Sequence, residues 1–300
     1  MRSRTETLDC LIIGGGPAGL LAAIYFGRYR RHVQVIDAAE SRAAKIPLSH
    51  NYPGFFGITG PELLARLRAQ AEEYGVLLMG GRITSLRKEG RIFIASGPHI
   101  EMQANFVLLA TGLVDHCPQV ESTPDCPTDA VRFCPICDGY EAIDRRVGVL
   151  GDLSTGAKKA LFLRTYTKHV SIFAVGEVSG SADTRQALAA ANVMVLDKPR
   201  QIKVTPAGGV SIVTESGTSH ELDAMYPALG CAAQSDLATA LGASRTDTGN
   251  LVVDDHQRTT VSGLYAAGDV VTDLHQLSVA FGHAAVAATD IHNRLPANYR

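Results

Sequence analysis

Short apolar runs recur along the chain, and glycine, proline or polar residues bound each of them. The first run covers residues 8–13. It is followed by a glycine-rich turn, an apolar helix of small residues over 20–29, and a second run over 33–37. Short apolar runs between turn residues are typical of strands buried in a parallel sheet. Strands that alternate with helices in this way predict a βαβ unit at the start of the chain.

The same order returns in the middle of the chain. Residues 147–151 predict a strand, residues 157–163 a helix and residues 169–173 a further strand. Residues 117–132, which lie between the two units, are rich in Pro, Asp and Thr and lack periodicity, so they are interpreted as a linker. The chain therefore contains a degenerate internal repeat of two nucleotide-type folds.

The turn after the first strand has the spacing of a dinucleotide fingerprint, Gly14-Gly15-Gly16-Pro17-Ala18-Gly19. Gly14 makes the tight turn, Gly16 lets the backbone approach a pyrophosphate, and Gly19 lets helix and strand pack closely. The helix N-terminus meets the phosphates, and Asp37 at the end of the second strand accepts a hydrogen bond from the adenosine ribose. The fingerprint alone does not distinguish FAD from NAD.

Composition and charge exclude several classes of function. The chain has 300 residues, enough for two domains, and its 46% hydrophobic and 19% charged residues describe a globular protein. A net charge of -2 offers no basic surplus for nucleic-acid phosphates. No apolar stretch approaches the ~20 residues needed to cross a membrane, and no secretory signal is present. Six cysteines with one close pair do not form a disulfide framework, so a reducing, cytoplasmic location is expected.

The close pair lies in Cys134-Pro135-Ile136-Cys137-Asp138-Gly139. Two cysteines at this spacing can close a disulfide, accept two electrons and pass them on by thiolate attack. Asp138 can move the proton that such exchange requires. If Cys134 caps a helix, Pro135 falls at its first position and Cys137 in its first turn, where the helix dipole favours a thiolate. The alternative is half of a zinc site, for which no second Cys-x-x-Cys is found.

Three further segments narrow the choice of cofactor. One strand-like run ends in Thr111-Gly112, another ends in Gly268-Asp269, and a helix rich in Ala, Gly and Ser covers 276–291. Together with the Cys-x-x-Cys-Asp-Gly motif, they resemble the low-molecular-weight thioredoxin reductase family of flavoproteins, over nearly the whole chain.

The resemblance implies an α/β fold of two Rossmann-like, three-layer nucleotide-binding domains, the second inserted in the first. A split FAD-binding domain is expected at residues 1–116 and 247–300. The inserted NAD(P)-type domain at 117–246 is degenerate and carries the Cys-x-x-Cys motif. A homodimer is expected from the same resemblance.

The resemblance also assigns residues to FAD. Asp269 would contact the ribityl chain, and the helix start at His275-Gln276-Leu277 would face the pyrimidine, where a positive helix end suits a reduced flavin. Family members often carry another residue at the position of His275. Asn51 belongs to an Asn-aromatic-Pro-Gly loop beside the flavin, or is an ordinary turn residue. The fingerprint and strand ends complete the set: Gly14, Gly16, Pro17, Ala18, Gly19, Asp37, Thr111, Gly112 and Gly268.

The second domain departs from relatives that use NADPH. Leu153 stands at the glycine position where the backbone must come nearest the pyrophosphate. Asp152 adds a negative charge, and at ~4 Å with an effective dielectric of about 20 its repulsion could approach ~4 kcal/mol. No arginine follows Phe173 in the next several positions to bind a 2′-phosphate. An ordinary NADPH site is therefore not expected.

Two lysines, Lys158 and Lys159, stand early in the next predicted helix, where acids are common in the family. They could attract an anionic ligand of another kind. Solvated surface lysines are the favoured interpretation, because such residues are common on helices.

The expected activity is FAD-dependent dithiol–disulfide exchange. Cys137 would exchange electrons with the flavin, and Cys134 would form a mixed disulfide with thioredoxin or another disulfide substrate. Asp138 would donate and accept the proton. Ferredoxin, or a second FAD in the inserted domain, is the expected source of electrons.

Other functions remain open on the sequence alone. They are an NADPH-dependent thioredoxin reductase, a dithiol oxidase that uses oxygen, a non-catalytic flavin redox sensor and a zinc protein. The oxidase branch of the family commonly carries His after the second cysteine. Asp138 is of the reductase type, which counts against the oxidase.

Overall fold

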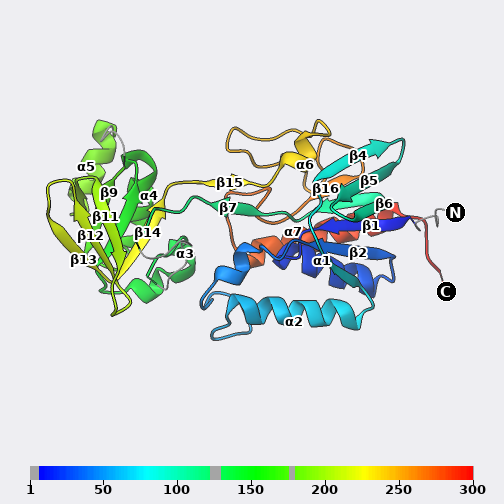
Figure 1. Cartoon of the computed structure of the whole chain (residues 1–300), viewed down its shortest axis with the longest axis horizontal. Helices are drawn as coiled ribbons and strands as arrows, with labels where there is room; N and C mark the ends of the chain where they lie inside the picture. The colour runs from blue at the N-terminus through cyan, green and yellow to red at the C-terminus, as the bar shows by residue number, and fades with distance from the viewer. Residues whose placement is uncertain (1–6, 122–129, 176–179, 300) are drawn as a thin grey trace. The chain divides into compact units, whose positions relative to one another are not determined.

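The computed structural model describes residues 7–121, 130–175 and 180–299. Contacts divide the chain into two compact units, of which the first combines Met1–Val114 with Ala232–Arg300 and the second is Asp115–Cys231. Figure 1 shows both units and labels many of their elements.

The second crossing between the units comes earlier in the chain than the predicted boundary at 246/247. Residues 232–246 group with the first unit. The Gln234 N–H donates to the Gly112 carbonyl at 2.9 Å, and Ala238 and Ala243 are buried in the core of the first unit. These contacts account for the difference.

A seven-stranded sheet forms the middle layer of the first unit, from β1 (Leu8–Ile13), β2 (Val33–Asp37), β3 (Leu77–Gly80), β4 (Ser85–Glu89), β5 (Ile92–Gly97), β6 (Ile100–Leu109) and β16 (Leu264–Ala266). Its order is β3-β2-β1-β6-β5-β4, with β16 also beside β6. The pairs β3–β2, β2–β1, β1–β6 and β16–β6 are parallel, whereas β4, β5 and the start of β6 are antiparallel. The nearly continuous apolar sequence of β1 follows from burial on both faces.

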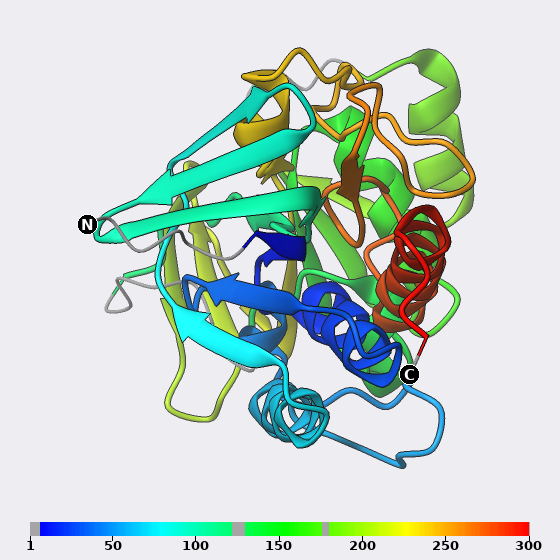
Figure 2. The same cartoon turned by 90° about the vertical axis from the view of Figure 1, so that its right-hand side faces the viewer.

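Helices α1 (Pro17–Arg28), α2 (Gly60–Glu73) and α7 (Leu277–Arg294) cover one face of this sheet, and α1 and α7 lie side by side (Figure 2). The buried residues of α7 recur at helical spacing and are mostly alanines: Ala280, Ala284, Ala287, Ala288 and Ile291. Such small side chains permit the close approach of the two helices. A second core on the other face includes residues of β4, β5 and the short helix α6 (Asp236–Thr239).

The two crossing segments pair with each other. Strands β7 (Leu113–Asp115) and β15 (Cys231–Ala233) form a two-stranded sheet. The chain thus leaves and re-enters the first unit through adjacent strands.

The second unit has three layers around a four-stranded parallel sheet of order β10-β9-β8-β14, made of β8 (Val147–Gly151), β9 (Val170–Ala174), β10 (Met194–Leu196) and β14 (Ala224–Ala228). Helices α4 (Leu153–Leu163) and α5 (Ala182–Ala190) cover one face. An antiparallel sheet of β11 (Pro199–Val204), β12 (Val210–Thr214) and β13 (Ser219–Leu222) covers the other. Successive residues of β8 face opposite layers, because Val149 packs in the α4 core and Leu150 in the β12 core.

The cysteine motif lies in this second unit, on the short helix α3 (Pro135–Asp138), with the turn η2 (Tyr140–Ala142) after it. In the part of the chain that the structure describes, no helix is both long and apolar enough to cross a membrane.

Candidate functional site

The turn between β1 and α1 holds the three fingerprint glycines, and the packing of the protein explains two of them but not the third. A Cβ on Gly14, which has a φ of 111°, would lie 2.3 Å from the Ala110 carbonyl oxygen, and a Cβ on Gly19 would lie 1.9 Å from the Gly14 oxygen. The packing of the protein itself therefore requires these two glycines. A Cβ on Gly16 would meet only the Ser41 side chain, at 3.2 Å, so no backbone atom of the protein forbids a side chain there.

The first turn of α1 is not capped by a side chain. Gly16 is the N-cap residue and makes no side-chain hydrogen bond, and Pro17 occupies the start of the helix. Backbone N–H groups at such a helix start can bind a phosphate. The open cradle at Gly16 and the uncapped helix start fit the pyrophosphate of a dinucleotide.

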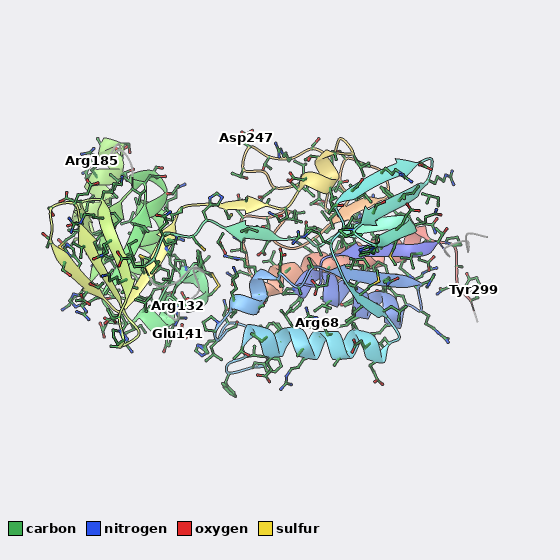
Figure 3. The ribbon with its side chains drawn as sticks, viewed as in Figure 1. Arg68, Arg132, Glu141, Arg185, Asp247 and Tyr299 are labelled. Carbon is green, nitrogen blue, oxygen red and sulfur yellow. A yellow bond between two sulfur atoms is a disulfide. The ribbon has the colours of Figure 1, made fainter. Side chains whose placement is uncertain are left out.

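Asp37 ends β2 beside this turn, and protein groups hold its carboxylate. Its Oδ1 accepts from the N–H groups of Gly15 (3.2 Å) and Ala39 (3.0 Å), and its Oδ2 accepts from Arg68 (2.7 Å). Arg68 extends from α2 (Figure 3). The predicted ribose acceptor is thus fixed in place, and a carboxylate has about four acceptor sites, enough to take a further hydroxyl.

Gly112 follows β6 and Gly268 follows β16, and because these strands are parallel neighbours both glycines lie at the same edge of the sheet. Both glycines have positive φ, 66° and 83°. A Cβ on Gly268 would come within 3.0 Å of the Ala18 side chain, so the turn after β16 reaches the start of α1. Thr111 donates its hydroxyl to the Gln234 carbonyl at 2.7 Å.

Asp269 follows Gly268 and faces Arg42, with 3.4 Å between the Arg42 Nη1 and the Asp269 Oδ2. The helix α7 places His283 nearby. The Nδ1 of His283 is buried and finds no hydrogen-bond partner among the described residues. Burial lowers the pKa of His283, and the charge of Asp269 opposes this effect. The buried Nδ1 of His283 fits a hydrogen bond with a polar group of a bound cofactor. No sequence motif indicated a role for this residue.

Asn51 and the start of α7 meet directly. The Asn51 amide donates to the Gln276 side-chain oxygen at 2.9 Å, and Ser49 donates to Asn51 at 3.2 Å. Gln276 in turn donates to the His275 carbonyl at 3.0 Å, and Leu277 begins the helix. The structure therefore joins the loop and the helix start that the family resemblance assigned to one cofactor.

The cysteine pair of the second unit is a disulfide, with 5.3 Å between the two Cα atoms. Cys134 caps α3 and Pro135 begins it, as the sequence predicts. The capping bond runs from the Cys137 N–H to the Cys134 Sγ at 3.2 Å. The helix start thus favours a negative charge on Cys134 as well as on Cys137.

Asp138 is the last residue of α3, and its side chain is 13% exposed. Its Oδ2 lies 3.5 Å from the Arg132 Nη1, while its buried Oδ1 accepts no hydrogen bond from the described residues. Burial raises the pKa of Asp138 to about 6, although the charge of Arg132 opposes this rise. Arg132 and Glu141 both lie near α3 (Figure 3). A carboxyl group with this pKa can both give and take a proton near neutral pH.

Two tyrosines support the end of α3. The Tyr226 hydroxyl, from β14, donates to the Asp138 backbone carbonyl at 3.4 Å. Burial raises the pKa of Tyr226, so the phenol stays protonated. A Cβ on Gly139 would lie 2.7 Å from the Tyr166 ring. Sequence reasoning missed Tyr226, because only the fold brings it beside Asp138.

The start of α4, where the insert would bind a pyrophosphate, is capped by the protein. The Asp152 Oδ1 accepts from the N–H groups of Ser154 (2.9 Å) and Thr155 (2.8 Å) and from both of their hydroxyls. Hydrogen bonds from Ser154 and Thr155 lower the pKa of Asp152, so the carboxylate is charged at neutral pH. Leu153 is buried in the α4 core.

The other cysteines give no second redox or metal centre in the described residues. Cys10 is buried, which raises the pKa of its thiol, whereas Cys117 is exposed and Cys231 is half-buried. Cys126 lies outside the described residues. Across 7–121, 130–175 and 180–299, no group of three or more His, Cys, Asp or Glu side chains is placed to hold a metal ion. The disulfide also leaves Cys134 and Cys137 without the thiolates that zinc requires.

Comparisons with known proteins show which family the chain belongs to. The family model for pyridine nucleotide-disulphide oxidoreductases matches residues 8–288. The thioredoxin reductase of Peptoclostridium acidaminophilum is 29% identical, over 97% of this chain and 98% of that protein. The crystal structure of thioredoxin reductase from Streptococcus pyogenes MGAS5005 has a TM-score of 0.86 and 25% identity, over 96% of this chain and 97% of that one. The atypical thioredoxin reductase TRi from Desulfovibrio vulgaris Hildenborough is 34% identical with a TM-score of 0.54, over 96% and 97%.

These matches confirm the predicted fold class, an α/β fold with two nucleotide-binding domains, and the predicted enzyme class. FAD is the cofactor typical of the family, and the cradle at Gly16 with the uncapped start of α1 fits it. The chain belongs to the pyridine nucleotide-disulphide oxidoreductase family, as a thioredoxin reductase-like flavin disulfide oxidoreductase.

Proposed function

We propose that the protein is an FAD-dependent dithiol–disulfide oxidoreductase whose electrons come from a donor other than NADPH. The observation that carries this proposal is the Asp152 carboxylate at the start of α4. It accepts hydrogen bonds from the two backbone N–H groups, of Ser154 and Thr155, that a pyrophosphate would use. A phosphate that binds there must therefore displace the charged side chain of Asp152, which is the N-cap residue of α4.

The rest of the insert supports the same conclusion. A 2′-phosphate needs basic side chains after the second strand, and the first arginine that follows β9 in the sequence is Arg185. Arg185 lies on α5 and donates to the Gly180 carbonyl at 3.4 Å. NADPH therefore lacks both of the phosphate contacts that relatives of this fold use.

Asp152 also opposes a second FAD, which would bring its own pyrophosphate to the start of α4. We therefore propose one FAD per chain and a reduced electron-carrier protein of the ferredoxin class as donor. Extraction of the cofactor and its ratio to protein tests this part. A ratio of two would favour the diflavin branch.

The FAD would be held in the first unit. The cradle at Gly14, Gly16 and Gly19 and the start of α1 would take the pyrophosphate, and Asp37 the adenosine ribose. Pro17 and Ala18, at the start of α1, would lie beside the pyrophosphate. Gly268 with Asp269, and Asn51 with Gln276, would line the flavin end, together with Thr111, Gly112, His275 and Leu277. When bound, the flavin supplies two-electron transfer to or from the disulfide.

The residues of the second unit would carry out the exchange with substrate. In the reduced pair, the Cys134 thiolate attacks the substrate disulfide and one substrate sulfur leaves. Asp138 gives that sulfur its proton. Cys137 then attacks the mixed disulfide, which releases the second substrate thiol and restores the Cys134–Cys137 bond. In this scheme Cys137 is the cysteine that would exchange electrons with the flavin in the next reduction.

We propose a thioredoxin-like protein as the substrate. Relatives of this chain carry the name thioredoxin reductase. Ile136, between the two cysteines, is 51% exposed, which suits contact with a protein surface. We also propose a homodimer, by resemblance to the family, and sedimentation of the purified holoprotein tests that assembly.

The test of function is anaerobic turnover with oxidised thioredoxin as acceptor and free thiols as the readout. Reduced ferredoxin should support many turnovers, and NADPH and NADH should support none. Cys137→Ser should abolish turnover with every donor. Rapid turnover with NADPH would instead identify an ordinary thioredoxin reductase.

Two other outcomes identify the remaining candidate functions. Oxygen consumption with small dithiols in air would identify a dithiol oxidase. Absence of turnover with every donor and acceptor, despite a reversible disulfide, would identify a flavin redox sensor.

A further inference from the structure

The backbone that leads into the disulfide pairs with β14 for only a short distance. Val131 and Met225 form a parallel bridge, in which the Met225 N–H donates to Ala130 at 2.7 Å and the Arg132 N–H donates to Met225 at 2.8 Å. The next donor along β14 would be residue 227, which is a proline and has no N–H. The ladder therefore ends before it reaches Cys134.

A side chain from α4 replaces the missing ladder. The Lys159 ammonium donates to the Pro227 carbonyl at 2.5 Å and to the Phe133 carbonyl at 3.0 Å. One of these carbonyls belongs to β14, and the other belongs to the residue directly before Cys134. Lys159 is only partly exposed, whereas its neighbour Lys158 is exposed. The expectation of two solvated lysines holds for Lys158 and is wrong for Lys159.

The two ends of α3 are thus tied to the same strand. Lys159 joins the entry of α3 to Pro227, and Tyr226 donates to Asp138 at its exit. The positively charged ammonium of Lys159 donates a hydrogen bond to the peptide group that joins Phe133 to Cys134. Such a charge favours a thiolate over a thiol or disulfide sulfur.

We propose that Lys159 is a positioning residue for the redox-active pair: it fixes the entry of α3 against β14 and favours the reduced state of Cys134 and Cys137. The proposal rests on the proposed function, since it concerns the same disulfide. It assigns to one lysine of α4 the task of making the pair a better electron acceptor.

The test compares Lys159→Met with Lys158→Met, its matched neighbour, in the full-length holoprotein. Each protein is equilibrated anaerobically at one slightly alkaline pH with mixtures of reduced and oxidised dithiothreitol. Reduced dithiothreitol passes two electrons and two protons to the disulfide and closes to its own cyclic disulfide. Thiols are then blocked with a maleimide, and the tryptic fragment 133–145, whose only cysteines are Cys134 and Cys137, is analysed by mass spectrometry.

Lys159→Met should lower the equilibrium constant for reduction about tenfold, which equals a shift of about 30 mV to a more negative potential. Lys158→Met should leave the constant unchanged. Lys159→Arg, which keeps the charge and the donors, should recover most of the wild-type constant. A purely structural role would not produce this pattern, because it predicts no shift of potential in a folded variant.

An unchanged constant in Lys159→Met, or an equal shift in Lys158→Met, would overturn the proposal. If Lys159→Met does not bind flavin, Lys159→Gln takes its place, and a wild-type constant in that variant overturns the proposal in the same way. A wild-type disulfide that no ratio of dithiothreitol can reduce would refute the proposed function instead. The two failures are therefore distinguishable.

Discussion

Asp138 shows how burial tunes a single side chain. Its carboxyl group is 13% exposed, and within the described part of the chain one of its oxygens accepts no hydrogen bond, so the charged form is poorly solvated. Burial therefore raises the pKa of Asp138 to about 6, from an ordinary 3.8, despite the opposing charge of Arg132. The raised pKa makes the folded protein less stable at neutral pH, but it lets Asp138 exchange a proton close to that pH.

The stability consequence follows from proton linkage. Between pH 3.8 and about 6 the folded protein retains a proton on Asp138 that the unfolded chain releases. The stabilisation that comes from protonated Asp138 is therefore complete below pH 3.8 and is lost by about pH 6. Asp138→Asn removes the charge. It should raise the free energy of unfolding above pH 7 by up to about 3 kcal/mol and have little effect near pH 4. Urea unfolding of the oxidised holoprotein across that range measures the difference; a variant less stable than wild type above pH 7 would contradict it.

The catalytic consequence concerns the same substitution. In the proposed reaction with a disulfide substrate Asp138 is the proton donor, so the wild-type rate profile should bend near pH 6. Asp138→Asn should lose that inflection and lower the rate about 10²-fold. Single-turnover reoxidation of the reduced holoprotein by thioredoxin, followed across pH, measures both. An Asn variant that retains the bend would assign it to another group.

Sequence reasoning reached the residues of this site that are neighbours in the chain. Cys134, Cys137 and Asp138 stand within one motif, and its spacing predicts a disulfide with an acid beside it. Lys159 and Tyr226 come from α4 and β14, far along the chain, and only the fold brings their donors to the two ends of α3. Local pattern cannot show such contacts.

At the scale of elements, the strand–turn–helix units were predictable because their patterns are local. The predicted strands at 8–13, 33–37 and 147–151 coincide with β1, β2 and β8. Helix α1 begins earlier than the apolar pattern indicated, at Pro17. The predicted linker ends in residues that pair with β14, because Val131 bridges Met225, and no periodicity reveals a single bridge.

The glycines of the first turn predict two separable defects. Gly16 has a φ of -80°, which alanine adopts readily, and a Cβ there meets only the Ser41 side chain. Gly16→Ala should therefore fold normally and lose FAD. A Cβ on Gly19 would lie 1.9 Å from the Gly14 oxygen, so Gly19→Ala should destabilise the fold itself by about 3 kcal/mol.

Flavin absorbance per chain and far-ultraviolet circular dichroism of the purified proteins separate these two effects. Full FAD content in Gly16→Ala would refute the pyrophosphate assignment. Native stability in Gly19→Ala would refute the packing argument.

At the scale of the whole molecule, the chain holds two nucleotide-type folds with different helix starts. In the first unit α1 begins at a glycine with no side-chain cap, whereas in the second unit α4 begins under the Asp152 carboxylate. The sequence predicted repulsion from Asp152. The structure adds that this carboxylate already uses the helix amides, which a linear pattern does not show.

This contrast makes the electron donor the central claim. Asp152, and the lack of basic residues in the sequence between β9 and Arg185, both support the proposal that the second unit does not bind NADPH. The disulfide, Asp138 and the contacts of Lys159 and Tyr226 with the two ends of α3 are all present in this chain. The protein would thus keep the dithiol half of its family's chemistry and take its electrons elsewhere.

An anaerobic titration of the holoprotein with NADPH, followed by the visible absorbance of the flavin, tests this claim most directly. We expect the flavin to stay oxidised under excess NADPH and then to be fully bleached by dithionite in the same cuvette. Stoichiometric bleaching by NADPH would contradict it.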